Sequence, residues 1–180
     1  QVKRITEKLS SFIVGEKITS IDIMSGRYVT HGPPSGLGEF IDSLPATVTK
    51  VGCKGKFIYI LFDNDYSIWN TLGMAGSWSP IIGKHSRFKL NFKDGSAYFN
   101  DIRNFGTIRV TSDVGDLYKK LGSLGPDMLS ENVSDTVFMA RLRKKNLKTV
   151  AEAIMNQSII SGVGNYLKSE ALYLAQISPH

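Results

Sequence analysis

Apolar residues recur with the period of a helix at the start of the chain. After it they occur in short runs that are typical of β-strands. Spacings of three and four residues predict an amphipathic helix over residues 1–14, carried by Val2, Ile5, Leu9 and Phe12. Runs rich in β-branched and aromatic residues then predict strands at 18–23, 47–51, 57–62, 66–70, 88–92 and 97–99, divided by turns at 63–65 and 93–95 and a loop at 32–36. Many short strands divided in this way indicate an antiparallel sandwich or barrel.

The pattern becomes helical again after Thr111. It predicts helices at 114–121, 134–143 and 149–158, and a further helix from Asn165 to Ala175. We therefore predict an α+β protein. An antiparallel β-sandwich with an N-terminal helix occupies residues 1–112, and a helical domain occupies 113–180. The first helix starts without a capping residue and the chain ends at Ser178-Pro179-His180, so we expect the natural protein to extend beyond both ends.

The turn Gly162-Val163-Gly164-Asn165 joins the last two helical segments. Glycine permits the positive φ of a sharp reversal, and Asn165 is a favourable N-cap. Free backbone N–H groups at such a positive helix end bind phosphate. An ordinary helical hairpin whose glycines fit the turn explains the spacing equally well. Dinucleotide binding through Gly162 and Gly164 is disfavoured, because the third glycine and the preceding strand are missing.

Three loops of the strand region carry side chains suited to nucleic acid. Residues 52–56 place Lys56 before an apolar strand, residues 72–77 place Met74 in a glycine-rich turn, and residues 101–106 place Arg103 and Phe105 two positions apart. A basic, a flexible apolar and an aromatic side chain can hold phosphate and wedge between bases. The alternatives are a solvated lysine, a methionine that fills the core and a phenylalanine packed on a sheet.

Composition adds a modest preference for polyanions. The 180 residues include 22 Lys and Arg against 16 Asp and Glu, which gives a net charge of +6 and a pI near 9.4. No apolar run approaches the roughly 20 residues that span a bilayer, so no membrane partner is expected. The single cysteine Cys53 and the histidines show no zinc-ligand spacing, so we predict no metal or cofactor in this chain.

Five motifs in order resemble the formamidopyrimidine-DNA glycosylase / endonuclease VIII family across the whole chain. They are Lys-Gly-Lys-Phe from Lys54, Leu-Gly-Met-x-Gly from Leu72, Asp-x-Arg-x-Phe-Gly from Asp101, Leu-Gly-Pro-Asp from Leu124, and Gly-Val-Gly-Asn-Tyr from Gly162. The resemblance implies a β-sandwich followed by a helical module whose glycine turn belongs to a helix-two-turn-helix (H2TH) element.

The resemblance also implies roles for single residues. Lys56 matches a lysine that contacts a phosphate beside the lesion and assists catalysis. Asn165, with the amides around Gly162 and Gly164, matches a phosphate clamp. Glu170 matches a glutamate that supports the site.

Three further positions match the residues that fill the void left by the damaged base. Arg103 would pair with the orphaned opposite base. Phe105 would insert as a wedge at the neighbouring base step, and Met74 would be the third residue that fills the void. Two positions depart from the family pattern. Thr71 stands where many relatives carry a histidine, and Asn104 replaces a frequent basic residue, so contacts with the DNA backbone are expected to be weaker.

The activity that the resemblance implies is a bifunctional DNA glycosylase / AP lyase of base-excision repair. The partner would be double-stranded DNA with oxidised bases or abasic sites, bound by an intracellular monomer. The family nucleophile is an N-terminal proline followed by an acid/base glutamate, and neither has a matching position before Gln1. A neutral α-amino group suits the role because its pKa is far below that of lysine. The family's C-terminal finger, often zinc-binding, is also unmatched, so the printed chain is expected to bind DNA weakly without cleaving it.

A non-catalytic nucleic-acid-binding H2TH protein is the alternative interpretation. The codons that precede Gln1 distinguish the two, since Met-Pro-Glu favours the enzyme. The choice between oxidised purines and oxidised pyrimidines stays open at this stage.

Overall fold

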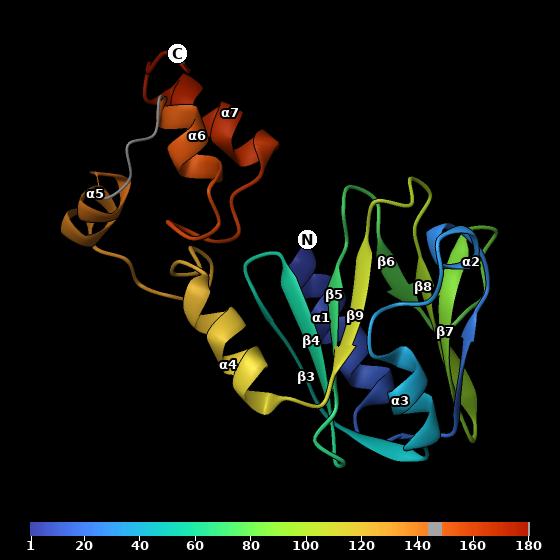
Figure 1. The fold of residues 1–180 in the computed structure, drawn as a ribbon. Helices are drawn as coiled ribbons and strands as arrows, with labels where there is room; N and C mark the ends of the chain where they lie inside the picture. Colours follow the sequence, from blue (N-terminus) through green and yellow to red (C-terminus); the bar gives the residue numbers. More distant parts are fainter. Residues whose placement is uncertain (144–148, 180) are drawn as a thin grey trace. The chain divides into compact units, whose positions relative to one another are not determined.

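The computed structural model describes residues 1–143 and 149–179, so the histidine at position 180 lies outside the described residues. The chain divides into two compact units (Figure 1). Unit 1 contains residues 1–53 and 57–117, and unit 2 contains residues 54–56 and those from 118 onward. The two therefore divide within helix α4 (Val114–Ser123), a few residues after the domain boundary predicted at 112/113.

Unit 1 is a sandwich of two β-sheets. The first sheet has the order β1-β3-β4-β5-β9, and the second has the order β2-β7-β8-β6. The strands of the first sheet are β1 (Lys17–Ile18), β3 (Ala46–Lys54), β4 (Phe57–Phe62), β5 (Ser67–Thr71) and β9 (Thr107–Thr111). Those of the second are β2 (Ser20–Ile23), β6 (Ser77–Ser79), β7 (Ser86–Phe92) and β8 (Gly95–Asn100). The predicted antiparallel sandwich is confirmed.

The strand predicted over residues 18–23 is two strands in different sheets. Ile18 lies opposite Ala46 in the first sheet, whereas Ser20 lies opposite Asn91 in the second. The switch occurs at Thr19, whose N–H donates to the Asn91 carbonyl at 2.8 Å. Strands β6 and β9 were not predicted from the sequence. Two short helices that were not predicted, α2 (Arg27–Thr30) and α3 (Leu37–Asp42), flank the predicted loop at 32–36.

The core of unit 1 follows from the period-two alternation of the strands. Strand β7 alternates buried and partly exposed residues from Ser86 to Leu90, which places Phe88 and Leu90 in the interior. Helix α1 (Val2–Ile13) confirms the predicted N-terminal helix and buries Leu9 and Ile13 against the same core. Full burial of such side chains stabilises the fold by roughly 1.5–3 kcal/mol each.

Unit 2 is helical and has a smaller core. Its remaining helices are α5 (Asp135–Arg143), α6 (Val150–Met155) and α7 (Asn165–Leu174). Three residues form the buried cluster, namely Ala153, Ile159 and Ile160. Helix α6 begins where the Thr149 hydroxyl accepts the Glu152 N–H at 3.2 Å. It ends before the predicted residue 158, because Asn156 is extended and its side chain accepts the N–H of Ser158 at 3.0 Å.

Candidate nucleic-acid interface

The Asp101–Gly106 loop joins β8 to β9 and is fixed by its own first residue. Asp101 is only 1% exposed. Its Oδ1 accepts the Arg103 N–H at 3.2 Å, and its Oδ2 accepts the Gly106 N–H at 2.7 Å. An aspartate that accepts an N–H group two residues ahead is typical of a turn, so Asp101 at the start of the loop is a sequence signal for this arrangement. The carboxylate closes the loop, and between its ends the side chains of Ile102, Arg103 and Phe105 are exposed.

The structure brings Met74, Arg103 and Phe105 together on the surface of unit 1. Met74 is 65% exposed and Phe105 is 58% exposed, so neither the core nor the sheet-packed alternative holds. Arg103 Nη1 donates to Met74 Sδ at 3.4 Å. The two loops touch at Gly73, where an added Cβ would lie 2.9 Å from the Phe105 Cβ. A cation, a thioether and an aromatic ring therefore share one exposed site.

Thr71 and Asn104, the two departures from the family pattern, make local polar contacts. The Thr71 and Thr107 hydroxyls lie 2.6 Å apart across the β5–β9 pair. Asn104 adopts a left-handed φ of 60° and its Oδ1 accepts the Arg27 N–H at 3.3 Å. Both side chains thus bind groups of the fold, and the weaker contacts with the DNA backbone expected at these positions stay a prediction.

Lys56 belongs to unit 2 rather than to the sandwich. The neighbouring Gly55 N–H donates to Asp127 Oδ2 at 3.0 Å, and Lys54 pairs with Glu131 at 3.7 Å. An added Cβ at Gly55 would lie 2.8 Å from the Gly162 nitrogen. The tip of the β3–β4 hairpin is therefore packed against the glycine turn. Asp127, from the Leu-Gly-Pro-Asp motif, received no role from the sequence, yet its carboxylate makes this attachment.

The Lys56 ammonium lies beside the start of α7. An added Cβ at Gly164 would be 2.8 Å from Lys56 Nζ. No carboxylate of the described residues forms an ion pair with Lys56. Burial lowers the pKa of Lys56 from its ordinary value, because partial loss of hydration disfavours the charged form. A cation close to the positive end of a helix favours an anionic ligand.

The glycine turn differs in two respects from the prediction. Gly162 has the expected positive φ of 97°, but its N–H is not free, since it donates to Gln157 Oε1 at 3.0 Å. The N-cap of α7 is Gly164, not Asn165. Asn165 is the first helical residue, and its exposed side chain accepts a bond from Lys168 Nζ at 3.2 Å. The candidate groups for anion binding are then the N–H groups of the first turn of α7 and the side chains of Lys56 and Asn165.

Gln157 holds the turn together and was assigned no role from the sequence. Besides accepting the Gly162 N–H, its Nε2 donates to the carbonyls of Met155 and Val163 at 3.0 Å each. One amide side chain thus fixes both sides of the reversal. Its position on the apolar face of the predicted helix gave no signal for this function. Glu170 lies exposed on α7, and its supporting role stays a prediction.

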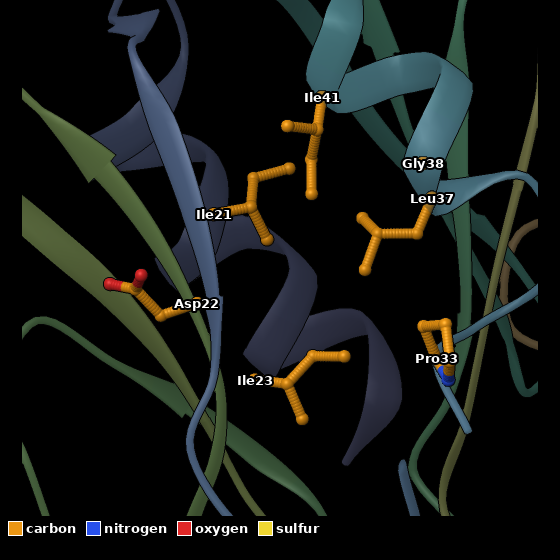
Figure 2. A pocket seen from close by; sticks show the side chains of 7 residues that line it. All are labelled: Ile21, Asp22, Ile23, Pro33, Leu37, Gly38 and Ile41. Atoms are coloured by element: carbon orange, nitrogen blue, oxygen red, sulfur yellow. The ribbon is translucent and has the colours of Figure 1, made fainter. Parts of the chain in front are cut away.

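A shallow pocket of about 360 Å³ lies elsewhere on unit 1, between β2 and α3. Figure 2 shows Ile21 and Ile23 turned toward Leu37 and Ile41, and Asp22 turned away from them. The Asp22 carboxylate instead accepts a bond from Asn91 and pairs with Lys89. The pocket therefore presents apolar side chains without a convergent polar group and has no catalytic candidate.

Within residues 1–143 and 149–179, no group of three or more His, Cys, Asp or Glu residues could hold a metal ion. Over the same residues, no helix has the length and apolar character needed to cross a membrane.

A two-sheet sandwich followed by a helical unit with a basic glycine turn defines a protein of the H2TH class. The comparisons with known proteins agree. A family model described as the formamidopyrimidine-DNA glycosylase N-terminal domain matches residues 1–108. A second, described as the formamidopyrimidine-DNA glycosylase H2TH domain, matches residues 124–180. Since the first model alone covers more than half of the chain, the chain belongs to the formamidopyrimidine-DNA glycosylase family.

Individual relatives give the same result. The chain is 30% identical to the formamidopyrimidine-DNA glycosylase of Oceanobacillus iheyensis and 31% identical to that of Corynebacterium jeikeium. These alignments include 99% of this chain but 65% and 68% of the relatives' lengths. The chain thus spans about two thirds of the curated relatives it matches.

Solved structures share the fold at a similar level of identity. One is a complex of the Lactococcus lactis enzyme with DNA containing an abasic site, with a TM-score of 0.80 and 28% identity over 99% of this chain and 66% of that chain. Another is a complex of the same enzyme with DNA containing FAPY-dG, with a TM-score of 0.80 and 27% identity over 99% of this chain and 68% of that one.

Proposed function

We propose that the protein of which this chain forms part is a DNA glycosylase that removes damaged bases and cleaves the strand at the resulting abasic site. The observation that carries the proposal is the exposed contact between Met74 and Arg103 beside Phe105. Exposed apolar side chains next to a guanidinium are costly in water, and they suit a surface that replaces a base inside a duplex. Membership of the glycosylase family supports the same function.

The sandwich unit reads the lesion. A damaged base must leave the stack before an enzyme can act on it, and the loss of stacking costs a few kcal/mol. Phe105 would stack at the opened step, Met74 would fill the space of the missing base, and Arg103 would donate hydrogen bonds to the orphaned base. These contacts form only where a base can be extruded, so they favour damaged or mismatched sites.

The helical unit binds the phosphate backbone. The Lys56 ammonium and the first N–H groups of α7 converge at Gly164, where a phosphate would supply the negative charge that Lys56 lacks among the described residues. Asn165 adds an exposed amide at the same helix end. These contacts are independent of base sequence and provide affinity rather than specificity.

The chemistry requires an amine that is neutral near physiological pH. In the proposed mechanism, an N-terminal proline nitrogen attacks C1′ of the sugar and the base departs with the glycosidic electrons. Cleavage of the C1′–O4′ bond, with a proton delivered to O4′, then opens the sugar ring and leaves an iminium between the proline nitrogen and C1′. This iminium permits loss of the 3′ and then the 5′ phosphate by elimination. A glutamate next to the proline would transfer the protons. Both residues would precede Gln1, and Lys56 would assist by holding a phosphate beside the lesion.

Borohydride trapping tests this function. The full-length protein is mixed with duplex DNA containing an abasic site, and the mixture is reduced so that hydride addition converts the iminium into a stable amine. We expect a covalent protein–DNA adduct and, without borohydride, strand cleavage. The control is the same protein with its terminal amine blocked by an added residue, which should still bind abasic DNA. Binding without any adduct from the unblocked protein would favour the non-catalytic H2TH alternative.

A further inference from the structure

Arg87 lies at an irregularity of β7 next to the Asp101–Gly106 loop. Ser86 is opposite Asn100 and Phe88 is opposite Phe99 in the β7–β8 pair, so Arg87 is the additional residue of a β-bulge. A bulge redirects a side chain that regular alternation would place on one face of the sheet, and bulges are frequent beside functional sites. Here the half-buried Arg87 stands between buried Ser86 and Phe88, and its guanidinium reaches the loop that presents Arg103 and Phe105.

The guanidinium of Arg87 joins two segments of the chain. Its Nε donates to the Asp101 carbonyl at 2.8 Å, and Nη2 reaches the Ile102 carbonyl at 3.5 Å. Its Nη1 donates to the Ser25 hydroxyl at 3.0 Å. The planar guanidinium can donate in several fixed directions at once, which an ammonium group cannot reproduce. Arg87 thus holds the carbonyl side of the loop, while the Asp101 carboxylate holds its amide side.

The segment around Gly26 completes this support. Asn104, within the loop, accepts the Arg27 N–H. Gly26 has a φ of 83°, and an added Cβ would lie 2.6 Å from Asn104 Oδ1 and 3.0 Å from Arg87 Cδ. Only glycine leaves room for both side chains here without strain. Residues 25–27 are therefore a fixed surface against which the loop is held.

We propose that Arg87 is a positioning residue that sets the Asp101–Gly106 loop for base reading before DNA arrives. The loop's exposed side chains cannot order themselves, since Ile102 and Phe105 are 65% and 58% exposed. When the backbone beneath them is already fixed, insertion of these side chains into DNA has a smaller entropic cost. Arg87 acts through the loop, since its guanidinium donates to the Asp101 and Ile102 carbonyls and to the Ser25 hydroxyl. This inference rests on the proposed function of the loop as the lesion reader.

The test compares Arg87→Met and Arg87→Lys with wild type in the full-length protein. Methionine keeps an unbranched chain next to Gly26 but removes every donor, whereas lysine keeps the charge without the planar group. The matched control is Arg109→Met, which removes the same charge from an exposed arginine that contacts Trp69 and Asp116. Thermal unfolding checks that each variant folds. The probe is a duplex with a tetrahydrofuran abasic analogue opposite each of the four bases, with 2-aminopurine next to the site.

For each protein we compare its affinity for the duplex with the best-bound opposite base and for the duplex with the worst-bound one. We expect Arg87→Met to lower the ratio of these two affinities about tenfold and to reduce the 2-aminopurine unstacking signal. Affinity for undamaged duplex should match that of Arg109→Met. Arg87→Lys should resemble Arg87→Met in base discrimination. Full discrimination in Arg87→Met, or full rescue by lysine, would overturn the positioning role. If wild type itself does not distinguish abasic from undamaged DNA, the proposed function fails instead.

Discussion

The surroundings of Lys56 disfavour the charged form of its amino group. The ammonium lies next to Gly164 at the positive end of α7, and no ion pair with a described carboxylate compensates it. A surface lysine selected for stability would extend into water. Lys56 instead fits a site whose missing partner is an anion, so its position favours binding at the expense of stability.

Replacement of Lys56 by methionine should therefore stabilise the free protein at neutral pH. Burial lowers the pKa of Lys56 in the folded state below its unfolded value of 10.5, so the unfolded chain binds more protons between these two values. The stability of wild type consequently rises with pH across that window. The advantage of Lys56→Met should shrink over the same window, as measured by urea unfolding at several pH values.

The same substitution should weaken binding to abasic DNA by about tenfold at low salt, because a charge-assisted contact with phosphate is lost. It should also reduce the slope of log K against log salt by about 0.9. Unchanged DNA affinity together with an unchanged salt slope would show that Lys56 contacts no phosphate.

At the scale of single elements, the two glycines of the turn have different roles although they lie two positions apart. Gly162 has a φ of 97° and is needed for the backbone path. Gly164 has an extended conformation that any residue adopts, with φ −119° and ψ −179°. What limits Gly164 is the Lys56 ammonium, which is the mobile end of a long side chain.

Alanine at each glycine separates these roles. Gly162→Ala should destabilise the protein by about 1 kcal/mol or more, since a Cβ is strained at positive φ. Gly164→Ala should leave the melting temperature nearly unchanged but displace Lys56, so that affinity for abasic DNA falls severalfold. Thermal unfolding and a DNA titration on both variants measure the difference. Equal effects of the two substitutions on stability would contradict this assignment.

At the scale of the whole molecule, the two units differ in how much apolar surface they bury. The core of unit 1 includes Phe40, Phe88 and Phe99 at 2% exposure or less, whereas the buried cluster among the described residues of unit 2 has no aromatic member. Helix α5 has no buried residue within its described length. Local opening is easier where few apolar groups leave water.

Native-state hydrogen exchange should follow this difference. Amides of β4 and β5 should exchange only through global unfolding of unit 1, and amides of α5 should exchange through local opening of much lower free energy. Mass spectrometry of peptides from each element measures the order in which their amides exchange. Protection of α5 equal to that of β4 would contradict the prediction and would require additional contacts to α5.

The sequence by itself determined the elements that have a clear period and pointed to the exposed side chains that we propose read the DNA. Helix α1 and strands β4 and β7 follow from apolar spacing, because that spacing decides which face of an element must leave water. Strand β9 was missed, although the alternating β-branched residues of Thr107–Thr111 are a local strand signal. The short strand β6 and the sheet switch at Thr19 could not be predicted. Their hydrogen bonds join residues distant in sequence, and local propensity does not specify a remote partner.

Only the tertiary structure decided how the side chains of the interface are held. The motifs identified Lys56, Met74, Arg103 and Phe105, but not the contact of Lys56 with Gly164 or the hydrogen bonds of Arg87 with the loop. The N-cap prediction for Asn165 was wrong because the backbone at Gly164 is already extended there and caps α7. Periodicity fixes which surfaces are buried, whereas the direction of a polar side chain depends on where a distant backbone places its donors and acceptors.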